Sequence, residues 1–451
     1  MPTIPLLSHT SPEQIVAWQH GEAISVRQFL ADAAQLAARL PAGKHLLNMC
    51  SDRYAFTVGL AAAILRDKIS LLPPSHTPEM ISQLQRYAPD IFCLSEQVQP
   101  FIVLPHTLYP ATPAPITDTC TIPQIDVNQH IAVVFTSGST GTPQPHPKTW
   151  GYVVHSVRAE ATRLGLMGDA SYTLIGTVPP QHMYGLESTV LMALHSGNAL
   201  SHQQPFYPAD ICGAIAAVPA PRVLISSPVH LRALLDSELQ PAELALLVSA
   251  TAPLSTPLAH ALEASYHAPL LEIYGSTETG LIATRRPIVG DEWQLLPGIS
   301  LVAEGEQIHA VSEHITPPIA MNDVIERIAA DRFLLHGRIA DLVNIAGKRN
   351  SLTNLNHQLT SIPGVMDGSF YMPDEASPDR ITRLAAVVVA PQLDAPQLLA
   401  ALRQCMDAVF LPRPLIFVDK LPRNRTGKLP RAAVQALLHH HTTKNLGLVN
   451  E

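Results

Sequence analysis

The sequence has few charged residues and no excess of positive charge. Only 15% of its 451 residues are charged, and 29 lysines and arginines against 37 aspartates and glutamates leave a net charge of −8. A protein that holds a nucleic-acid backbone by bulk charge normally has the opposite sign. We therefore expect no nucleic-acid partner, and we expect any phosphate group to be bound locally, by a loop.

Cysteine is scarce as well. The five cysteines are scattered, and no two of them have the Cys-x-x-Cys spacing that is typical of zinc sites, so neither a zinc site nor a disulfide framework is indicated. His439–His441 are three adjacent histidines that cannot all face one ion from a helix end, and we interpret them as a solvated tail.

Long apolar runs are also missing. The longest, such as Ala385–Ala390, are far too short to span a membrane. Residues 1–20 contain Pro2, Pro5 and Pro12 and no uninterrupted apolar stretch, which argues against a secretory signal. We expect no membrane span and a cytoplasmic location.

The chain does have a large apolar content, 47%, which excludes intrinsic disorder, and its length predicts two or three domains. In the first 130 residues helix-like and strand-like segments alternate. Ser25 and Gln28 form the pattern of a capping box, and Leu46–Cys50 is a short apolar run before a helix at Tyr54–Leu65. This alternation favours a parallel sheet covered by helices.

A proline- and threonine-rich stretch, Leu104–Gln124, interrupts the alternation, and we interpret it as a surface connection. The pattern resumes at Ile131–Phe135, gives way to short β-like runs after Leu295, and ends with two helices and two strands in the last 110 or so residues. We predict an α/β fold: a large N-terminal domain with helix-covered, mostly parallel sheets and a β-rich subdomain, and a small C-terminal α+β domain. The predicted central strands are Tyr172–Val178, Arg222–Ser226, Leu244–Ser249 and Leu270–Tyr274.

The most informative segment runs from Ile131 to Lys148. An apolar strand leads into Thr136-Ser-Gly-Ser-Thr-Gly141, a loop of hydroxyls and glycines whose backbone N–H groups can surround an anion. It lacks the Gly-Lys-Ser/Thr of a Walker loop. Taken alone, such a run could equally be a surface turn, but the preceding strand and the Gly141-Thr142-Pro143 exit favour a phosphate site.

Three later segments extend this pattern. Tyr274–Gly280 reads YGSTETG and offers an aromatic ring, hydroxyls and one carboxylate after an apolar strand. Gly337–Asp341 reads GRIAD at the end of another strand, and Pro422–Lys428 reads PRNRTGK, a basic loop on an acidic chain.

These segments, together with Val178–Gly185 and Ser249–Leu254, resemble in order and separation the core motifs of the adenylate-forming superfamily of acyl- and aryl-acid ligases. The resemblance covers residues from about 20 to 435 and implies a nucleotide- and acid-binding core at 1–337, a hinge at 338–341 and a small mobile domain at 342–451. In shortness and motif variants the chain is most similar to stand-alone ligases of aryl-polyene or polyketide-like clusters.

The resemblance implies a two-step reaction. A carboxylate attacks the α-phosphorus of ATP bound with Mg²⁺ and releases pyrophosphate, and a thiol then displaces AMP; no tightly bound organic cofactor is implied. The expected thiol is the phosphopantetheine of a carrier protein, with free coenzyme A as the alternative. A degenerate nucleotide-binding member with little turnover is a second alternative.

The resemblance also implies roles for individual residues. Thr277 would contact the α-phosphate, Glu278 would bind Mg²⁺, and Lys428 would bridge the reacting carboxylate and the α-phosphate. Tyr274 would stack on adenine, while Asp323 and Arg338 would hold the ribose. The other nucleotide-binding residues would be Thr136, Ser137, Gly138, Ser139, Thr140, Gly141, Thr142, Thr251, Ala252, Gly275 and Ser276.

The acid would lie in a pocket that resembles the family's acyl site. The residues implied to line it are His182, Met183, Tyr184, Gly185, Ser226, Ser227, Ala250, Thr251 and Gly275, and His182 would also be close to the reaction. Few of these side chains are large, and none is a lysine or arginine that could pair with a second carboxylate. An aromatic or medium-chain monocarboxylic acid is therefore expected.

The chain departs from the family in three places. Gln144 stands where the phosphate loop normally has a lysine, and Lys148 is the nearest charge that could replace it. The hinge position, normally Asp or Lys, is Ala340. The motif around the ribose-binding aspartate is reduced to Met321-Asn322-Asp323.

Overall fold

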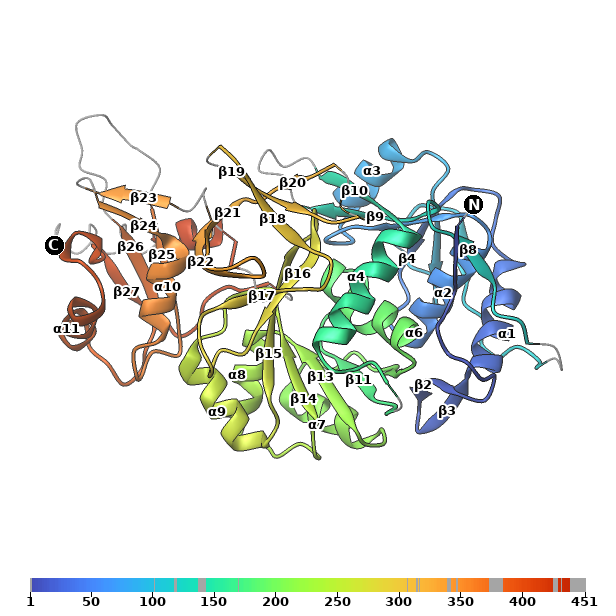
Figure 1. Ribbon diagram of the computed structural model, residues 1–451, viewed down its shortest axis with the longest axis horizontal. Helices are drawn as coiled ribbons and strands as arrows, with labels where there is room; N and C mark the ends of the chain where they lie inside the picture. Colours follow the sequence, from blue (N-terminus) through green and yellow to red (C-terminus); the bar gives the residue numbers. More distant parts are fainter. Residues whose placement is uncertain are drawn as a thin grey trace.

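The fold is known from a computed structural model, which describes residues 2–100, 102–116, 120–136, 143–168, 170–305, 307–313, 315, 317–338, 342–345, 348–372, 384–424, 429–430 and 432–438. Within these residues the chain is a mixed α/β protein, as predicted, with two large sheets and a separate C-terminal lobe (Figure 1). All five cysteines are free. No helix among the described residues is long and apolar enough to cross a membrane.

The first large sheet has six strands in the order β10-β9-β5-β4-β6-β7, all parallel except β10. Its strands are β4 (His45–Asn48), β5 (Ile69–Leu72), β6 (Phe92–Ser95), β7 (His106–Leu108), β9 (His130–Thr136) and β10 (Gln144–Thr149). Strand β7 lies inside Leu104–Gln124, so interpreting that whole stretch as a surface connection was wrong. The strand has only three residues and therefore shows no hydrophobic periodicity.

The second large sheet has eleven strands in the order β21-β22-β17-β16-β15-β14-β13-β11-β12-β2-β3. Its central strands, from β15 to β2, are parallel. The predicted central strands are confirmed with ends that shift by at most two residues, as β11 (Thr173–Gly176), β13 (Arg222–Ser226), β14 (Leu246–Ser249) and β15 (Leu270–Ser276). The others are β2 (Ile15–Gln19), β3 (Glu22–Ser25), β12 (Ala199–Ser201), β16 (Gly280–Arg285), β17 (Trp293–Leu295), β21 (Asp323–Arg327) and β22 (Arg332–Arg338).

Helices pack on both sheets because the helices bury apolar faces against them. The main helices of the core are α1 (Val26–Ala37), α2 (Arg53–Leu65), α3 (Pro78–Tyr87), α4 (Trp150–Arg163), α7 (Pro208–Ala216), α8 (Pro228–Asp236) and α9 (Thr256–Tyr266). Helix α2 is buried along nearly its whole length, as expected for a helix between two sheets. At the start of α1, Ser25 accepts a hydrogen bond from the Gln28 backbone as predicted, but the Gln28 side chain donates to Asp32 and Ala114 and does not complete a capping box.

Beyond residue 342 the chain forms a lobe at one end of the molecule (Figure 1). A three-stranded sheet, β25 (Asp367–Tyr371), β26 (Ala385–Val389) and β27 (Leu415–Phe417), packs with α10 (Leu352–Thr360) and α11 (Ala395–Cys405) around its own apolar core. Ser351 at the start of α10 donates a hydrogen bond to the His336 carbonyl of β22, 2.5 Å away, and so connects the lobe to the larger sheet. The predicted boundary and hinge at 338–341 stay predictions.

The described chain also has shorter elements, among them the helices α5 (Met183–Gly185) and α6 (Met192–Ser196) on either side of a π-helix, and a turn of 3-10 helix at Ala408–Phe410. A small sheet of β18 (Ser300–Glu304), β19 (Gln307–Val311) and β20 (Ile319–Ala320) belongs to the predicted β-rich region, and β23 (Leu342–Ile345) pairs with β24 (Lys348–Ser351). Strands β1 (Thr3–Pro5) and β8 (Gln124–Asp126) form a separate pair.

A buried ion pair in the larger sheet allows a test of how the core tolerates charge. Arg285 lies 2.7 Å from Glu272, with 9% and 3% of their side chains exposed, so Arg285→Met leaves a buried carboxylate without its partner. Such a loss costs about 3–5 kcal/mol, and we expect a clearly lower urea midpoint of unfolding. The control is Arg332→Met, which breaks a pair with Glu292 in which both side chains are 49% exposed, and a surface pair contributes only about 0–1 kcal/mol. Equal midpoints for the two variants would contradict the expectation.

Candidate active site

The turn between β15 and β16 presents Thr277 and Glu278. The ends of the turn are closed by mutual hydrogen bonds: the Ser276 N–H donates to the Thr279 hydroxyl at 3.2 Å, and the Thr279 N–H donates to the Ser276 hydroxyl at 3.1 Å. Gly280 follows with a φ of +66°, a conformation that glycine adopts without strain. The Glu278 side chain remains 38% exposed, so its carboxylate is accessible to a ligand.

Lys148 supports this turn from behind. Lys148 lies on β10, in the first sheet. Its Nζ donates a hydrogen bond to the Thr277 carbonyl oxygen at 2.6 Å, and Thr277 lies in a turn between two strands of the second sheet. The ammonium also lies 4.4 Å from the centre of the Tyr152 ring, a cation–π distance. Only 4% of Lys148 is exposed. The lysine that we considered as a replacement for the missing phosphate-loop charge is therefore bound to the backbone of the turn.

The surroundings of Lys148 contain a buried carboxylate, Glu187, which accepts a hydrogen bond from Ser156 at 2.9 Å. Burial lowers the pKa of Lys148 to about 8, although the charges of Glu187 and Glu278 oppose the change. Burial likewise raises the pKa of Glu187 to about 7, against the attraction of Lys148 and the Ser156 hydrogen bond. The two groups are thus both buried near the turn, and each charge favours the other.

His146 connects the start of the phosphate loop with the same turn. It lies two residues before Lys148 on β10, so the two side chains share one face of the strand. Its Nε2 is hydrogen-bonded to the Thr136 hydroxyl at 3.0 Å and lies 3.9 Å from the Glu278 carboxylate. Thr136 and Glu278, predicted from separate motifs, are therefore close together. The rest of the loop, 137–142, lies outside the described residues.

The residues assigned to adenine and ribose also come together. The Tyr274 hydroxyl donates to the Asp323 carboxylate at 2.5 Å, and Asp323 is directly opposite Arg338 in the β21–β22 ladder. The Tyr274 ring packs at a tilt against Trp293 and Phe333, with ring centres 5.5 and 5.9 Å away. These contacts hold the ring in place, and its stacking on adenine stays a prediction.

The segment assigned to the adenine site follows β14. Thr251 has a φ of +81°, which is rare for a β-branched residue and is found mainly at functional sites. The segment is anchored by the Leu254 N–H, which donates to Glu272 at 2.9 Å. Ala252 lies between Thr251 and the hydrogen-bonded Leu254, so the backbone is constrained before and after it.

The predicted acyl-site segment leads into a π-helix, Leu186–Leu191. Irregular turns of this type occur often at functional sites. Met183, Tyr184 and Gly185 are buried, and a Cβ on Gly185 would lie 2.0 Å from the Pro179 carbonyl oxygen, so only glycine fits. His182 precedes them at the helix start and is partly exposed.

Several predicted pocket side chains already have polar partners in the core. Tyr184 donates to the Val248 carbonyl at 3.5 Å, Ser226 shares a 2.9 Å hydrogen bond with Thr177, and Ser227 shares one of 2.8 Å with His230. Ser226 and Ser227 are fully buried and Ala250 nearly so. Their contact with an acid, like that of Gly275, stays a prediction.

One cavity lies beside the Thr277–Glu278 turn. It has a volume of about 370 Å³, and its wall includes Tyr152, Ser156, Thr279, Leu281 and Ile299. None of the predicted acyl-site residues lines this cavity.

Sequence reasoning missed Glu187, Tyr152, Ser156 and His146. The only signal for Glu187 was a carboxylate within an otherwise apolar run, which could equally have been a solvated helix position. Lys428 and Ala340 lie outside the described residues, and their roles stay predictions.

Comparison with known proteins shows the family and the relatives of this chain. Residues 8–319 match the family model described as AMP-binding enzyme. A 4-coumarate–CoA ligase of Rhodobacter capsulatus is 30% identical over 300 residues, covering 66% of this chain and 74% of that protein. A 4-chlorobenzoate–CoA ligase of Arthrobacter is 26% identical over 352 residues, covering 68% of this chain and 66% of that protein.

Solved structures share the fold. An anthranilate–CoA ligase in complex with anthranoyl-AMP superposes with a TM-score of 0.80 at 16% identity, covering 96% of this chain and 98% of that one. ATP-bound MatB from Rhodopseudomonas palustris gives a TM-score of 0.79 at 19% identity, covering 95% and 97%.

The buried lysine predicts a specific pH dependence of stability. Because burial lowers the pKa of Lys148 to about 8, against about 10.4 in an unfolded chain, the unfolded state binds more protons between these values. Stability therefore rises with pH in that window. We expect Lys148→Met to lack this rise. The urea midpoint of unfolding is measured for both proteins from pH 7 to 10.5, and the midpoint of the wild type minus that of the variant should increase with pH. Lys44→Met, at a side chain that is 44% exposed, should follow the wild type; a Lys148→Met profile parallel to the wild type would contradict the assignment.

Proposed function

Because this chain belongs to the AMP-binding enzymes, the family of adenylate-forming acid ligases, we propose that it activates an aromatic or medium-chain monocarboxylic acid and transfers the acyl group to a phosphopantetheine thiol. In the first step a carboxylate oxygen attacks the α-phosphorus of ATP and pyrophosphate leaves. In the second the thiolate attacks the acyl carbonyl and AMP leaves.

The observation that carries this proposal is the hydrogen bond from Lys148 on β10 to the Thr277 carbonyl, which holds the Thr277–Glu278 turn in place. Negative charge builds on the phosphate oxygens during adenylation, and donors fixed in advance stabilise it best. In our proposal the Thr277 hydroxyl faces the α-phosphate, and the loop that begins at Thr136 binds the other phosphates. The buried ammonium keeps the turn from moving when the charge develops.

The donor set beside the phosphates fits Mg²⁺. The Glu278 carboxylate is accessible, and Thr277 adds a hydroxyl oxygen next to it. Mg²⁺ is usually bound by one or two carboxylates together with substrate phosphates, and it supplies positive charge to them. We propose Glu278 as its protein ligand.

Tyr274, Asp323 and Arg338 would bind the nucleoside. The Asp323 carboxylate accepts a hydrogen bond from the Tyr274 hydroxyl, which orients it. Thr251 and Ala252 would contact the base through their backbone. The acid would enter beside His182, next to the buried Met183 and Ala250.

We propose an aromatic acid before a medium-chain one. Three of the relatives are named for 4-coumarate or 4-chlorobenzoate, both aromatic monocarboxylic acids. The acceptor that we prefer is a carrier protein, because of the motif variants at Gln144 and Ala340. Free coenzyme A is the second candidate, because the same relatives are named CoA ligases.

Lys428 should be required for adenylation. Replacing a preorganised donor at a reacting phosphate typically slows a reaction about 10²–10³-fold, and we expect that loss for Lys428→Ala in acid-dependent ATP–pyrophosphate exchange. Lys420→Ala, an exposed lysine on the same lobe, serves as the matched control and should keep wild-type exchange. Wild-type rates of ATP–pyrophosphate exchange by Lys428→Ala would show that Lys428 takes no part in adenylation.

The acid and the acceptor can be identified in one assay series. We expect pyrophosphate release with 4-coumarate-like and benzoate-like acids and little with dicarboxylic acids, and AMP rather than ADP as the nucleotide product. With the best acid, a holo carrier protein should form thioester faster than free coenzyme A. Faster thioester formation with coenzyme A would establish the second candidate, and no pyrophosphate release with any acid would indicate a nucleotide-binding protein with little turnover.

A further inference from the structure

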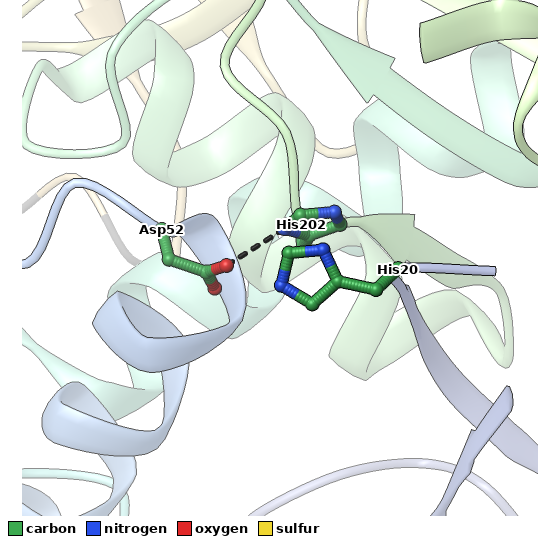
Figure 2. Close-up of side chains that lie close together, drawn as sticks. All are labelled: His20, Asp52 and His202. Atoms are coloured by element: carbon green, nitrogen blue, oxygen red, sulfur yellow. Dashed lines mark hydrogen bonds and ion pairs between the residues drawn. The ribbon is translucent and has the colours of Figure 1, made fainter. Parts of the chain in front are cut away.

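Three side chains that commonly bind metals meet at a place that the proposed reaction does not use. His20, Asp52 and His202 each offer a ligand atom, and these three atoms lie within 4.8 Å of one another. Figure 2 shows the two imidazole rings close together, with the Asp52 carboxylate beside them. The ring centres of His20 and His202 are 4.4 Å apart.

The topology of the two sheets brings these residues together. β2 and β12 are parallel neighbours, with Ser201 opposite Trp18, and each is followed directly by a histidine of the cluster. The carboxyl ends of parallel strands lie at the same edge of a sheet, so His20 and His202 are adjacent. Asp52 comes from the other sheet: it follows β4 and caps α2 by accepting the Ala55 N–H at 2.9 Å.

Asp52 and His202 already face each other through atoms that could bind an ion. The Nδ1 atom of His202 is hydrogen-bonded to the Asp52 carboxylate at 2.7 Å, and Figure 2 shows the carboxylate on this side of the ring. A cation placed between the two groups would be bound by Nδ1 of His202 and by a carboxylate oxygen of Asp52, in place of the shared proton. Neutral imidazole nitrogens and carboxylate oxygens are both ligands of transition-metal ions.

The placement of His20 is unusual for its position in the chain. It lies in the two-residue turn between β2 and β3, with a φ of +51°, and Gly21 follows at +83°. Turns of this kind prefer asparagine or glycine at the first position, and histidine is among the side chains that also adopt a positive φ. The turn therefore presents an exposed imidazole next to His202.

We propose that His20, Asp52 and His202 form a binding site for one divalent transition-metal ion of the zinc type. Two imidazoles and one carboxylate suit Zn²⁺, Ni²⁺ or Cu²⁺, whereas Mg²⁺ and Ca²⁺ prefer oxygen ligands only. Bond lengths of about 2.0–2.2 Å place tetrahedral ligand atoms about 3.4 Å apart. Rotation of the exposed His20 side chain can close the longest separation, and the fourth position is left to water.

The bound ion would connect the two large sheets at the edge of the protein core. It would join the β2–β3 hairpin, which is the last hairpin of the eleven-stranded sheet, to the start of α2 against the six-stranded sheet. The site is separate from the Thr277–Glu278 turn, and the proposal holds whether or not the proposed acid activation is correct.

The test uses the full chain, with His439–His441 replaced by glutamine in every sample because three adjacent histidines bind the same metals. This protein is stripped with a chelator and titrated calorimetrically with Zn²⁺, and its melting temperature is measured with and without the ion. We expect one equivalent to bind and the melting temperature to rise with the concentration of free Zn²⁺, because the ion binds the folded state. Absorption of bound Co²⁺ should indicate four-coordinate geometry with nitrogen and oxygen ligands.

His20→Asn is the decisive variant, since asparagine accepts the turn conformation and the position is exposed. We expect at least a 10-fold weaker affinity for Zn²⁺ and no rise in melting temperature. The matched control, His130→Asn, removes another exposed histidine at the start of β9 and should bind as the parent does. Equal affinities for His20→Asn, His130→Asn and the parent, or no bound equivalent in the parent, would overturn the proposal.

Discussion

The hydrogen bond from Lys148 to the Thr277 carbonyl connects the two halves of the candidate site. Its donor belongs to the six-stranded sheet, and its acceptor lies in the turn between β15 and β16 of the eleven-stranded sheet, so the hydrogen bond relates the turn to the first sheet. A buried ammonium is unfavourable unless opposite charge or polar groups surround it. Glu187 and the face of the Tyr152 ring supply that compensation.

Buried charges position other segments of the site in the same way. Arg53, which is fully buried at the start of α2, donates to the carbonyls of Gly176 and Val178 at 2.7 and 3.2 Å. It thereby holds the end of β11, where the segment leading to His182 begins. Glu272, paired with Arg285, anchors the segment that contains Thr251 through the Leu254 N–H. Both charges bind backbone groups at or shortly after the carboxyl end of a parallel strand, β11 or β14, and parallel sheets bind ligands at that edge.

The cluster of His20, Asp52 and His202 is a further connection between segments that follow strands of the two sheets. Like the Lys148 contact it joins the first sheet to the second, and like that contact it depends on side chains that are far apart in the sequence. Asp52 illustrates the link directly, because the same carboxylate caps α2 and binds His202.

The sequence by itself determined the α/β class, the central strands to within two residues and the chemical motifs, because hydrophobic periodicity and motif spacing are local properties of the chain. The resemblance of its motifs also predicted roles for Tyr274, Thr277, Glu278 and Asp323; these roles stay predictions, although the structure brings Tyr274 to Asp323 and Glu278 near Thr136. The sequence missed β7, which is too short to show a period. Only the tertiary structure decided that Lys148 supports the turn from behind, that Glu187 faces it, and that Tyr184, Ser226 and Ser227 already have partners in the core. These facts depend on which side chains meet after two sheets pack together, and no local pattern records the distance between residues 148 and 277 or between 20 and 202.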